Sequence, residues 1–231
     1  PARSSLSSPS PSLILQERAT WDGLIKAYDA GLVPAVGVSN FGPAQLRKVA
    51  RYLGRAGVPL ATTQVQCSLL SAGPDTRAAL AAAADLGVTV LSYSPLALGM
   101  LSGAYGQPLP GTEAAGRAGV AAARGGRVAQ PTPRYPPGPR GALFRSVLPK
   151  AEPLLLTIAS IAAAKRKAPS QVALAWCLAL ATVPLPGARC AAHVASHVGA
   201  LSCRLSPGDV AALDGAAAGV TGMVQNVFAT K

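Results

Sequence analysis

Residues 60–96 read LATTQVQCSLLSAGPDTRAALAAAADLGVTVLSYSPL. Within them, residues 60–67 and 88–92 are short runs rich in β-branched and apolar residues, which is typical of buried strands. Between these runs, Pro74 begins an alanine-rich segment that ends at Gly87, as a helix would. No tight-turn signal joins the two strands, so we expect them to run parallel with the helix crossing between them. The stretch predicts a β-α-β unit of a parallel sheet.

The same alternation continues on both sides of this unit. Upstream, residues 33–38 predict a buried strand, which follows a helix capped by Thr20 and precedes a helix that begins at Pro43. The elements expected downstream are helices over 151–167, from Pro169 and over 190–201, a strand over 182–186, and a last helix begun by the capping box Ser206–Asp209. The chain is therefore expected to be α/β, with about four parallel strands and flanking helices. Pattern alone leaves an open doubly wound sheet and a closed barrel both possible.

Composition and charge limit the classes of protein that remain. The chain has 231 residues, of which 50% are hydrophobic, and this excludes a wholly disordered protein. Its net charge is +12, and no acidic residue lies between Glu113 and Glu152. The excess of basic residues therefore falls in a Gly/Pro-rich loop expected over 103–150. We interpret this loop as solvated; an anion-facing lid and a nucleic-acid surface are the alternatives, and no RNA-binding or zinc-finger motif supports the last.

The N-terminal residues and the cysteines bear on the cellular compartment. Residues 1–20 are rich in Ser and Pro, which predicts a disordered arm or the remnant of a transit peptide. Four scattered cysteines are too few for a disulfide framework in a chain of this length, so a reducing compartment is expected. The uncharged stretch 172–188 contains Pro184 and Pro186 and is better interpreted as a buried helix followed by a strand than as a membrane span.

Six segments near the expected strands and helices carry a more specific signal. They read GVSNF (37–41), TQVQC (63–67), LSYSPL (91–96), PSQVAL (169–174) before Trp176 and Cys177, VPLPGAR (183–189) and RLSP (204–207). In this order and spacing, over roughly residues 21–215, the chain resembles the C-terminal half of the aldo-keto reductases. The tract from GPRG (138–141) to EPLL (152–155) is similar to the plant and algal branch of that family.

The resemblance implies part of an (α/β)8 TIM barrel that binds NADP(H) and reduces aldehydes or ketones. In the family, a Ser-Asn pair and a Gln hold the carboxamide of the nicotinamide, and an aromatic ring stacks on the nicotinamide. The matching residues here are Ser39, Asn40, Gln64 and Tyr93. The structural alternative is that Ser39 and Asn40 only cap the next helix and that Tyr93 is a core residue at the barrel rim.

The phosphates of the cofactor are expected to meet a second group of residues. The resemblance implies that the loop containing Ser94, Leu96 and Leu98 wraps the pyrophosphate with backbone N–H groups and the Ser94 hydroxyl. Arg189 stands where the family usually has Lys facing the adenosine 2′-phosphate, and this favours NADPH over NADH.

Two positions depart from the pattern of the family. Ser196 and His197 occupy positions where the family has an acidic residue and Asn beside the adenine. Ala168 replaces the usual Thr N-cap, which we expect to leave a donor unpaired at a cost of about 1 kcal/mol.

No catalytic residue is predicted in this chain. In the family, the Asp, Tyr, Lys and His that deliver a proton to the carbonyl come from the first four strands, and this chain is expected to begin after them. Tyr28, Tyr52, Tyr105 and Tyr135 match no catalytic position. We therefore expect half a barrel with two open edges and an exposed core face, which is marginally stable alone. A truncated gene model, a fragment and a degenerate paralogue are the possible origins.

A metal site is weighed and not predicted. Cys190, His193, His197 and Cys203 have ligand types and spacings that could hold zinc, but the corresponding segment of the family binds no metal. The resulting prediction is the cofactor-binding half of an NADPH-dependent reductase acting on a small-molecule carbonyl, in the chloroplast or cytoplasm, without nucleic acid or membrane. A non-catalytic NADP(H)-binding module and, less favoured, a basic nucleic-acid-binding protein are the alternatives. The oligomeric state is left open.

Overall fold

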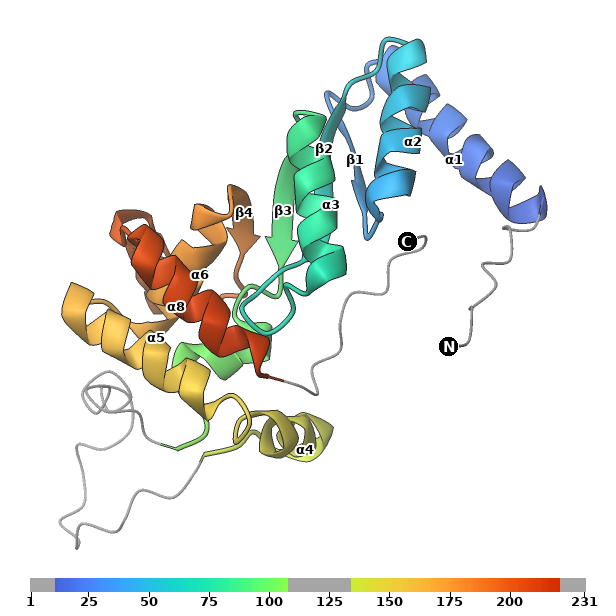
Figure 1. Cartoon of the computed structure of the whole chain (residues 1–231). Coiled ribbons are helices and arrows are strands. Elements are labelled where there is room, and N and C mark those ends of the chain that lie inside the picture. Colours follow the sequence, from blue (N-terminus) through green and yellow to red (C-terminus); the bar gives the residue numbers. More distant parts are fainter. Residues whose placement is uncertain (1–10, 108–133, 221–231) are drawn as a thin grey trace, which may run out of the picture.

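A computed structural model describes residues 11–107 and 134–220. Its centre is a four-stranded parallel sheet in the order β1-β2-β3-β4 (Figure 1). The strands are β1 (Val36–Ser39), β2 (Leu60–Gln66), β3 (Thr89–Tyr93) and β4 (Thr182–Leu185). All three strand pairs are parallel, as the absence of hairpin signals predicts.

Each strand is followed by helical structure, which confirms the expected alternation. Helix α2 begins with a proline at its first turn, as do α3, α6 and α8, because proline already has helical φ and the first N–H groups of a helix lack partners. The capping box at the start of α8 is present, with Ser206 Oγ accepting from the Asp209 N–H. The helices are α1 (Pro11–Asp29), α2 (Pro43–Arg55), α3 (Pro74–Asp85), η1 (Ala97–Ser102), α4 (Gly138–Val147), α5 (Glu152–Lys165), α6 (Pro169–Ala179), α7 (Ala191–Val198), η2 (Gly199–Ser202) and α8 (Pro207–Ala218).

The two faces of the sheet differ in burial. Residues in register lie on the same face, so Thr63, Val90 and Thr182 form one row, and all three are buried. The neighbouring row on the other face is Ser39, Gln64, Leu91 and Val183. Val183 and Leu185 on this face are 46% and 41% exposed. The described residues therefore leave one face of the sheet open, as expected for part of a barrel.

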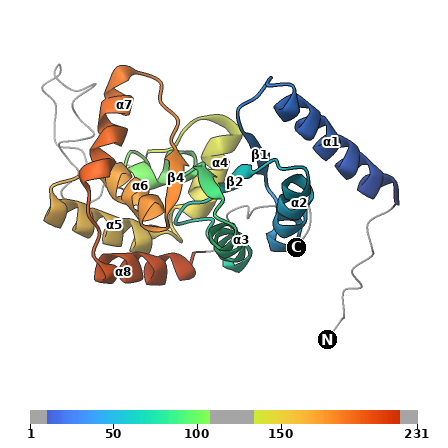
Figure 2. The ribbon, with the colours of Figure 1, turned by 90° about the horizontal axis from the view of Figure 1, so that it is seen from above.

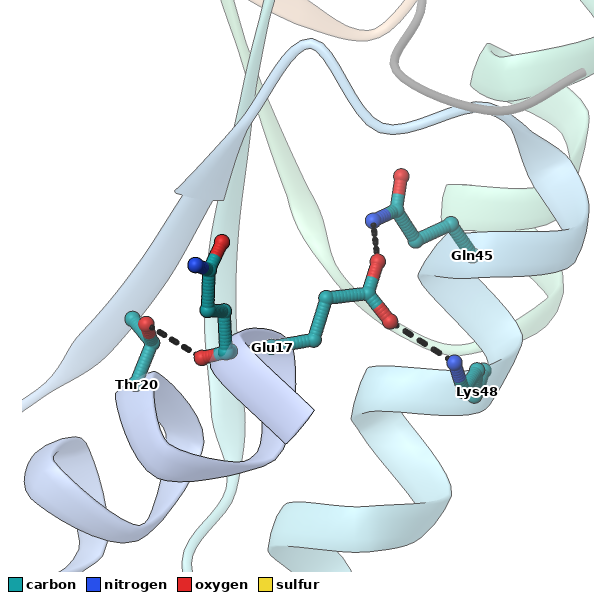
Figure 3. A network of polar contacts seen from close by, with 5 residues as sticks. Glu17, Thr20, Gln45 and Lys48 are labelled. Carbon is teal, nitrogen blue, oxygen red and sulfur yellow. Dashed lines mark hydrogen bonds and ion pairs between the residues drawn. The ribbon is translucent and has the colours of Figure 1, made fainter. Parts of the chain in front are cut away.

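Helix α1 begins at Pro11 rather than after Thr20, so the prediction of a disordered arm is wrong for residues 11–20. Residues 1–10 lie outside the described residues. Thr20 is inside the helix, where its hydroxyl donates to the carbonyl of Gln16. Glu17 fixes α1 on α2 by accepting from Gln45 at 2.6 Å and from Lys48 at 2.7 Å (Figure 3). Because Gln45 and Lys48 lie about thirty positions from Glu17 in the sequence, local composition does not predict these contacts.

The prediction of a long loop over residues 103–150 is also wrong in part. Residues 138–147 form α4, and residues 108–133 lie outside the described part of the chain. Gly138 and Pro139 begin this helix, and Phe144 and Val147 are fully buried on its inner face. The helix is only ten residues long with a weak apolar periodicity, so tertiary packing rather than local propensity stabilises it.

Helices α5, α6 and α8 pack together beside β4, while α1 and α2 lie at the opposite edge of the sheet beside β1 (Figure 1). Within the described residues, no single helix is long and apolar enough to cross a membrane. By length and composition alone, α4 and α5 pass this test only as a pair, with a bend of 87° between them.

Candidate functional site

The residues predicted to face a nicotinamide lie together at the carboxyl ends of three strands. The Tyr93 hydroxyl, at the end of β3, donates to Asn40 Oδ1 at 3.0 Å. The Asn40 N–H and the Ser39 hydroxyl, at the end of β1, both donate to the carbonyl of Gln64, at 2.9 and 3.1 Å. Ser39, Asn40, Gln64 and Tyr93 therefore form one connected cluster that spans β1, β2 and β3.

The backbone of this cluster has an unusual conformation. Asn40 has φ of 58°, in the left-handed region, where Asn is one of the few non-glycine residues that occur regularly. The Asn40 N–H still continues the ladder of β1 on β2, where it meets the carbonyl of Gln64, and the left-handed residue then turns the chain. Ser39 and Asn40 do not act as a helix cap: the residue before α2 is Gly42, and it makes no side-chain capping bond. The helix-cap interpretation of this pair is therefore wrong.

The loop after β3 has the same kind of backbone. Ser94, Ala97 and Leu98 have φ of 52°, 47° and 59°, and none of them is glycine. Such residues cost free energy, and they persist where surrounding contacts fix them. One such contact comes from Arg140 on α4, whose guanidinium donates to the carbonyl of Leu98.

The Arg140 guanidinium itself lies over two aromatic rings. It lies 5.1 Å from the ring centre of Phe144 and 5.7 Å from that of Tyr105. Arg140 belongs to the tract predicted to be a solvated loop, in which the sequence predicts no site residue. Its proximity to the loop after β3 depends on the position of α4, which local sequence did not reveal.

A cavity of about 780 Å³ is lined by residues that follow the strand-end cluster in the sequence, beginning with Ser94. A volume of this size is in the range of small-molecule and cofactor sites. Ser94, Leu96, Leu98 and Arg189 all line it, so the residues predicted to face the phosphates are together. The residues predicted to face the nicotinamide are not part of its lining; they connect to it through the Tyr93–Ser94 peptide. Of the described residues that line the cavity, none is acidic.

One wall of the cavity is the loop from β4 to α7 together with α7 itself. Figure 2 shows α7 beside α6 and β4. Arg189, His193, Ser196 and His197 line this wall. The Arg189 N–H donates to Nδ1 of His193 at 3.3 Å, and the two imidazole ring centres are 6.3 Å apart. Desolvation, followed by the nearby His193, lowers the pKa of His197 below its ordinary value.

The N-terminus of α6 lines the same cavity and differs from expectation at Ala168. The Ala168 N–H donates to Oε1 of Gln171, and the Gln171 N–H reaches the carbonyl of Ala168 at 2.9 Å. Gln171 thus supplies the bond that pairs the backbone N–H of Ala168. Ala168 offers no side-chain acceptor to the first turn, but the Gln171 N–H, which a Thr hydroxyl at this position could accept, pairs with the Ala168 carbonyl, so that donor is not left unpaired as predicted.

The histidines and cysteines of α7 do not form a metal centre. No group of three or more His, Cys, Asp or Glu residues is arranged to hold a metal ion among the residues that the structure describes. Cys190 is exposed before α7, while Cys203 is buried beyond its end. The zinc-like spacing in the sequence therefore does not correspond to a cluster in space.

The chemistry of these groups fits a phosphate-bearing dinucleotide. Amide and hydroxyl groups at the strand ends match a carboxamide, while hydroxyl, guanidinium and imidazole groups without acidic neighbours match phosphates. The strained loop 94–98 places backbone groups along the same cavity. The residues present are therefore compatible with NADP(H).

Comparisons with known proteins agree with this geometry. Residues 8–218 match the model of the aldo/keto reductase family. The chain is 41% identical over 218 residues to the chloroplastic pyridoxal reductase of Arabidopsis thaliana, covering 94% of this chain and 53% of that protein. It is 27% identical to the aldo-keto reductase yakc [NADP(+)] of Schizosaccharomyces pombe, covering 81% of this chain and 49% of that one. The chain thus spans about half the length of these relatives.

Solved structures show the same fold. The thermostable aldo-keto reductase Tm1743, in a complex with the inhibitor epalrestat, superimposes with a TM-score of 0.59 at 22% identity, covering 90% of this chain and 57% of that one. The Bombyx mori aldo-keto reductase AKR2E4, in a complex with NADP, gives 0.55 at 19% identity, covering 85% of this chain and 49% of that one. The sheet with its flanking helices corresponds to part of the barrel of these proteins. This chain belongs to the aldo/keto reductase family.

Proposed function

We propose that this chain is the cofactor-binding part of an NADPH-dependent reductase of aldehydes or ketones. The observation that carries the proposal is the hydrogen-bonded cluster of Ser39, Asn40, Gln64 and Tyr93 at the strand ends. The Tyr93–Ser94 peptide joins this cluster to a cavity whose described lining residues include Arg189 and no acidic residue. Membership of the aldo/keto reductase family supports the reaction class.

The strand-end cluster would hold the nicotinamide. Asn40 accepts from Tyr93 at Oδ1, and its amide NH2 is then oriented to donate to a carboxamide oxygen. Ser39 and Gln64 would supply the remaining polar contacts, and the Tyr93 ring would stack on the nicotinamide. Bound NADPH would supply the hydride that reduces the carbonyl carbon of the substrate.

The cavity would hold the phosphates. The Ser94 hydroxyl and the backbone around Leu96 and Leu98 would contact the pyrophosphate, and left-handed residues in that loop turn successive peptide groups. Arg189 would contact the 2′-phosphate of NADPH, since its planar fork binds two phosphate oxygens at once.

We assign proton delivery to no residue of this chain, because the tyrosines away from the cluster have structural contacts. The Tyr52 hydroxyl donates to Asp22, and that hydrogen bond raises the pKa of the phenol, which makes it a weaker acid. Tyr105 packs edge-on against Phe144, and Tyr135 lies beneath the Arg145 guanidinium. We therefore expect this chain to bind NADPH without reducing a carbonyl by itself.

The substrate of the whole protein would be a small-molecule carbonyl compound. The compartment stays a prediction of chloroplast or cytoplasm, and the name of the Arabidopsis relative favours the chloroplast. Imaging of a fluorescent fusion of the full-length protein would decide between the two compartments.

A titration followed by the fluorescence of NADPH itself tests the proposal. NADPH should bind more tightly than NADH, and adding an aldehyde should cause no oxidation. Asn40→Ala and Ser39→Ala should each weaken NADPH binding about five- to tenfold, the equivalent of one hydrogen bond. Ser160→Ala, which removes an exposed hydroxyl on α5, is the matched control and should bind as the unmodified chain does. Absence of NADPH binding, or equal affinities for Asn40→Ala and Ser160→Ala, would contradict the proposal.

A further inference from the structure

The wall of the cavity formed by α7 gathers cationic and titratable groups with no acidic counterpart. Arg189, His193 and His197 line it, and Arg140 lines the cavity from α4. His193 and His197 are four residues apart on α7, so they lie one helical turn apart on the same side. Their ring planes are inclined by 36°, with centres 6.3 Å apart. This spacing allows a single phosphate group to contact both imidazoles, and Arg189 lines the same cavity.

The hydrogen bonds of His193 fix which of its nitrogens can serve a ligand. Nδ1 accepts from the backbone N–H of Arg189, so in the neutral ring the proton is on Nε2. The Nε2–H group is therefore a donor before any protonation. The same bond ties the imidazole to the backbone of Arg189, and both residues line the cavity.

Within residues 11–107 and 134–220, the elements packed against α7 provide positive charge and no carboxylate. Helix α6, which packs against α7, contributes the neutral Gln171, whose Nε2 donates to the carbonyl of Ser196 at 2.8 Å. The short helix η2, also packed against α7, has no charged residue. Lys167, before α6, donates to Ser202 at 2.7 Å and is a further cation. The loop before α7 adds the exposed Cys190 and Arg189, so the histidines face no carboxylate from these elements.

We infer that His193 and His197, together with Arg189, form a proton-coupled phosphate site: binding of a phosphate monoester takes up a proton from solvent onto His197, while His193 contributes its Nε2–H as a donor. The inference rests on the proposed function, under which the ligand group is the 2′-phosphate of NADPH. A dianionic phosphate supplies the negative charge that this wall lacks, and it thereby favours imidazolium over neutral imidazole.

The charge state before binding gives the coupling its direction. Desolvation and the neighbouring His193 disfavour the imidazolium form of His197, so its pKa is lowered and the ring is neutral at pH 7. When phosphate binds, the proton enters from solvent, and affinity for the phosphate must rise as pH falls. Each proton taken up changes affinity by up to about tenfold per pH unit. NADH has no 2′-phosphate and should not show this dependence.

Proton NMR of the imidazoles gives a direct test, because His193 and His197 are the only histidines of the chain. Their C2–H resonances are followed from pH 5 to pH 9 in the full chain, alone and with adenosine 2′-monophosphate, adenosine or inorganic phosphate. Adenosine 2′-monophosphate should raise the apparent pKa of at least one histidine by about one unit, while adenosine should leave both unchanged. A smaller shift with inorganic phosphate would show that the phosphate group alone suffices. Unchanged titration curves with all three probes would overturn the inference.

Calorimetry in two buffers of different ionisation enthalpy then connects the site to the cofactor. At pH 7.5, binding of NADPH should take up more protons from solvent than binding of NADH does. Between pH 8 and pH 6.5, the affinity of the chain for NADPH should increase about three- to tenfold more than its affinity for NADH. The variant His193→Gln/His197→Asn keeps hydrogen-bonding groups and should abolish both differences. If NADPH binds with no excess proton uptake, the inference fails and the proposed function stands. If NADPH does not bind but adenosine 2′-monophosphate shifts the histidines, the proposed function fails and the phosphate site stands.

Discussion

The phenol of Tyr93 donates a hydrogen bond to Oδ1 of Asn40 at 3.0 Å, and this bond joins the ends of two strands that are not neighbours in the sheet. It passes over the end of β2, whose Gln64 carbonyl accepts from the backbone of Asn40. The loops after β1 and β3 are therefore fixed relative to each other by side chains as well as by the sheet. A ligand group placed there would meet an arrangement that exists before binding.

Tyr93→Phe measures the contribution of the Tyr93 hydroxyl to NADPH binding apart from that of the ring. Loss of the bond to Asn40 should weaken NADPH binding only about two- to fivefold, because Phe retains the stacking surface and a neutral hydrogen bond contributes about 1 kcal/mol. Tyr93→Ala removes the ring too and should weaken binding by a further order of magnitude or so. NADPH titrations of both variants measure this. Equal losses for the two would show that the ring does not stack on the nicotinamide.

Arg140 is expected to position the loop after β3. Arg140→Ala removes the donor to the Leu98 carbonyl and the cation above Tyr105 and Phe144, and should destabilise the chain by about 1–2 kcal/mol while weakening NADPH binding. Arg145→Ala is the control on the same helix, since Arg145 lies over Tyr135 at 5.8 Å and does not line the cavity. Urea unfolding and NADPH titration check both variants. The same loss of affinity in Arg145→Ala would point to a general effect of charge.

Asp214 on α8 bonds to residues of α3 and α6. Its Oδ1 accepts from the Arg77 guanidinium at 2.8 Å and from Nε1 of the buried Trp176 at 2.9 Å. Asp214→Ala leaves the indole N–H without its partner and should cost about 1–3 kcal/mol of unfolding free energy. Asp85→Ala breaks only the exposed pair with Arg47 and should cost less than about 0.5 kcal/mol. Similar midpoints in urea unfolding of the two variants would contradict this assignment.

Asp209 should make a small contribution to acid sensitivity. Hydrogen bonding to Lys165, followed by the backbone N–H of Ser206, lowers the pKa of Asp209 to about 2. A lowered pKa stabilises the folded state above the ordinary value of 3.8, and this stabilisation is lost as the pH falls toward about 2. The Lys165 and Asp209 side chains are 26% and 22% exposed, so solvent screens the pair in part and its contribution should be about 1 kcal/mol or less.

Asp209→Asn tests this dependence. The variant should be slightly less stable at pH 7 and should show a shallower loss of stability between pH 4 and pH 2 in urea unfolding. Lys165→Gln should reproduce part of that change, and adding it to Asp209→Asn should have little further effect. An unchanged acid limb in Asp209→Asn would show that Lys165 does not perturb this carboxyl group.

The four cysteines should differ sharply in reactivity. Burial raises the pKa of Cys67 to about 11 and also raises that of Cys177, while Cys203 is buried and Cys190 is exposed. A thiol reagent such as DTNB at pH 8 should label one thiol quickly, and Cys190→Ser should remove that fast phase. Four thiols should react after unfolding in guanidinium chloride. Two or more fast thiols in the folded chain would contradict the burial of the other three.

Much of the fold could be predicted because the responsible signals are local. The strand starting at Leu60 and the helices starting at Pro43 and Pro74 are each defined by neighbouring residues: a run of β-branched side chains, or a proline at the first helical turn. The capping box at Ser206 is equally local, and it is confirmed. The grouping of Ser39, Asn40, Gln64 and Tyr93 is implied by the resemblance to the aldo-keto reductases, and it agrees with the parallel sheet, since the carboxyl ends of parallel strands meet at one edge of a sheet.

Helices α1 and α4 could not be placed in this way. The first turns of α1 lie in a Ser- and Pro-rich segment, and the helix is fixed by Glu17 reaching Gln45 and Lys48 on another helix. Helix α4 lies in a Gly/Pro-rich tract, and burial of Phe144 stabilises it. In both cases, contacts made after the chain has folded outweigh the local composition.

By itself, the sequence determined the alternation of strands and helices, the parallel sheet and the residues at the strand ends, because periodicity, proline positions and capping groups act over a few residues. Tertiary structure alone decided that Arg140 holds the carbonyl of Leu98, 42 positions away, and that Glu17 on α1 bonds to Gln45 and Lys48 on α2. Those relationships depend on how helices pack around the sheet. Packing is set by the whole set of contacts, which no single segment of the chain contains.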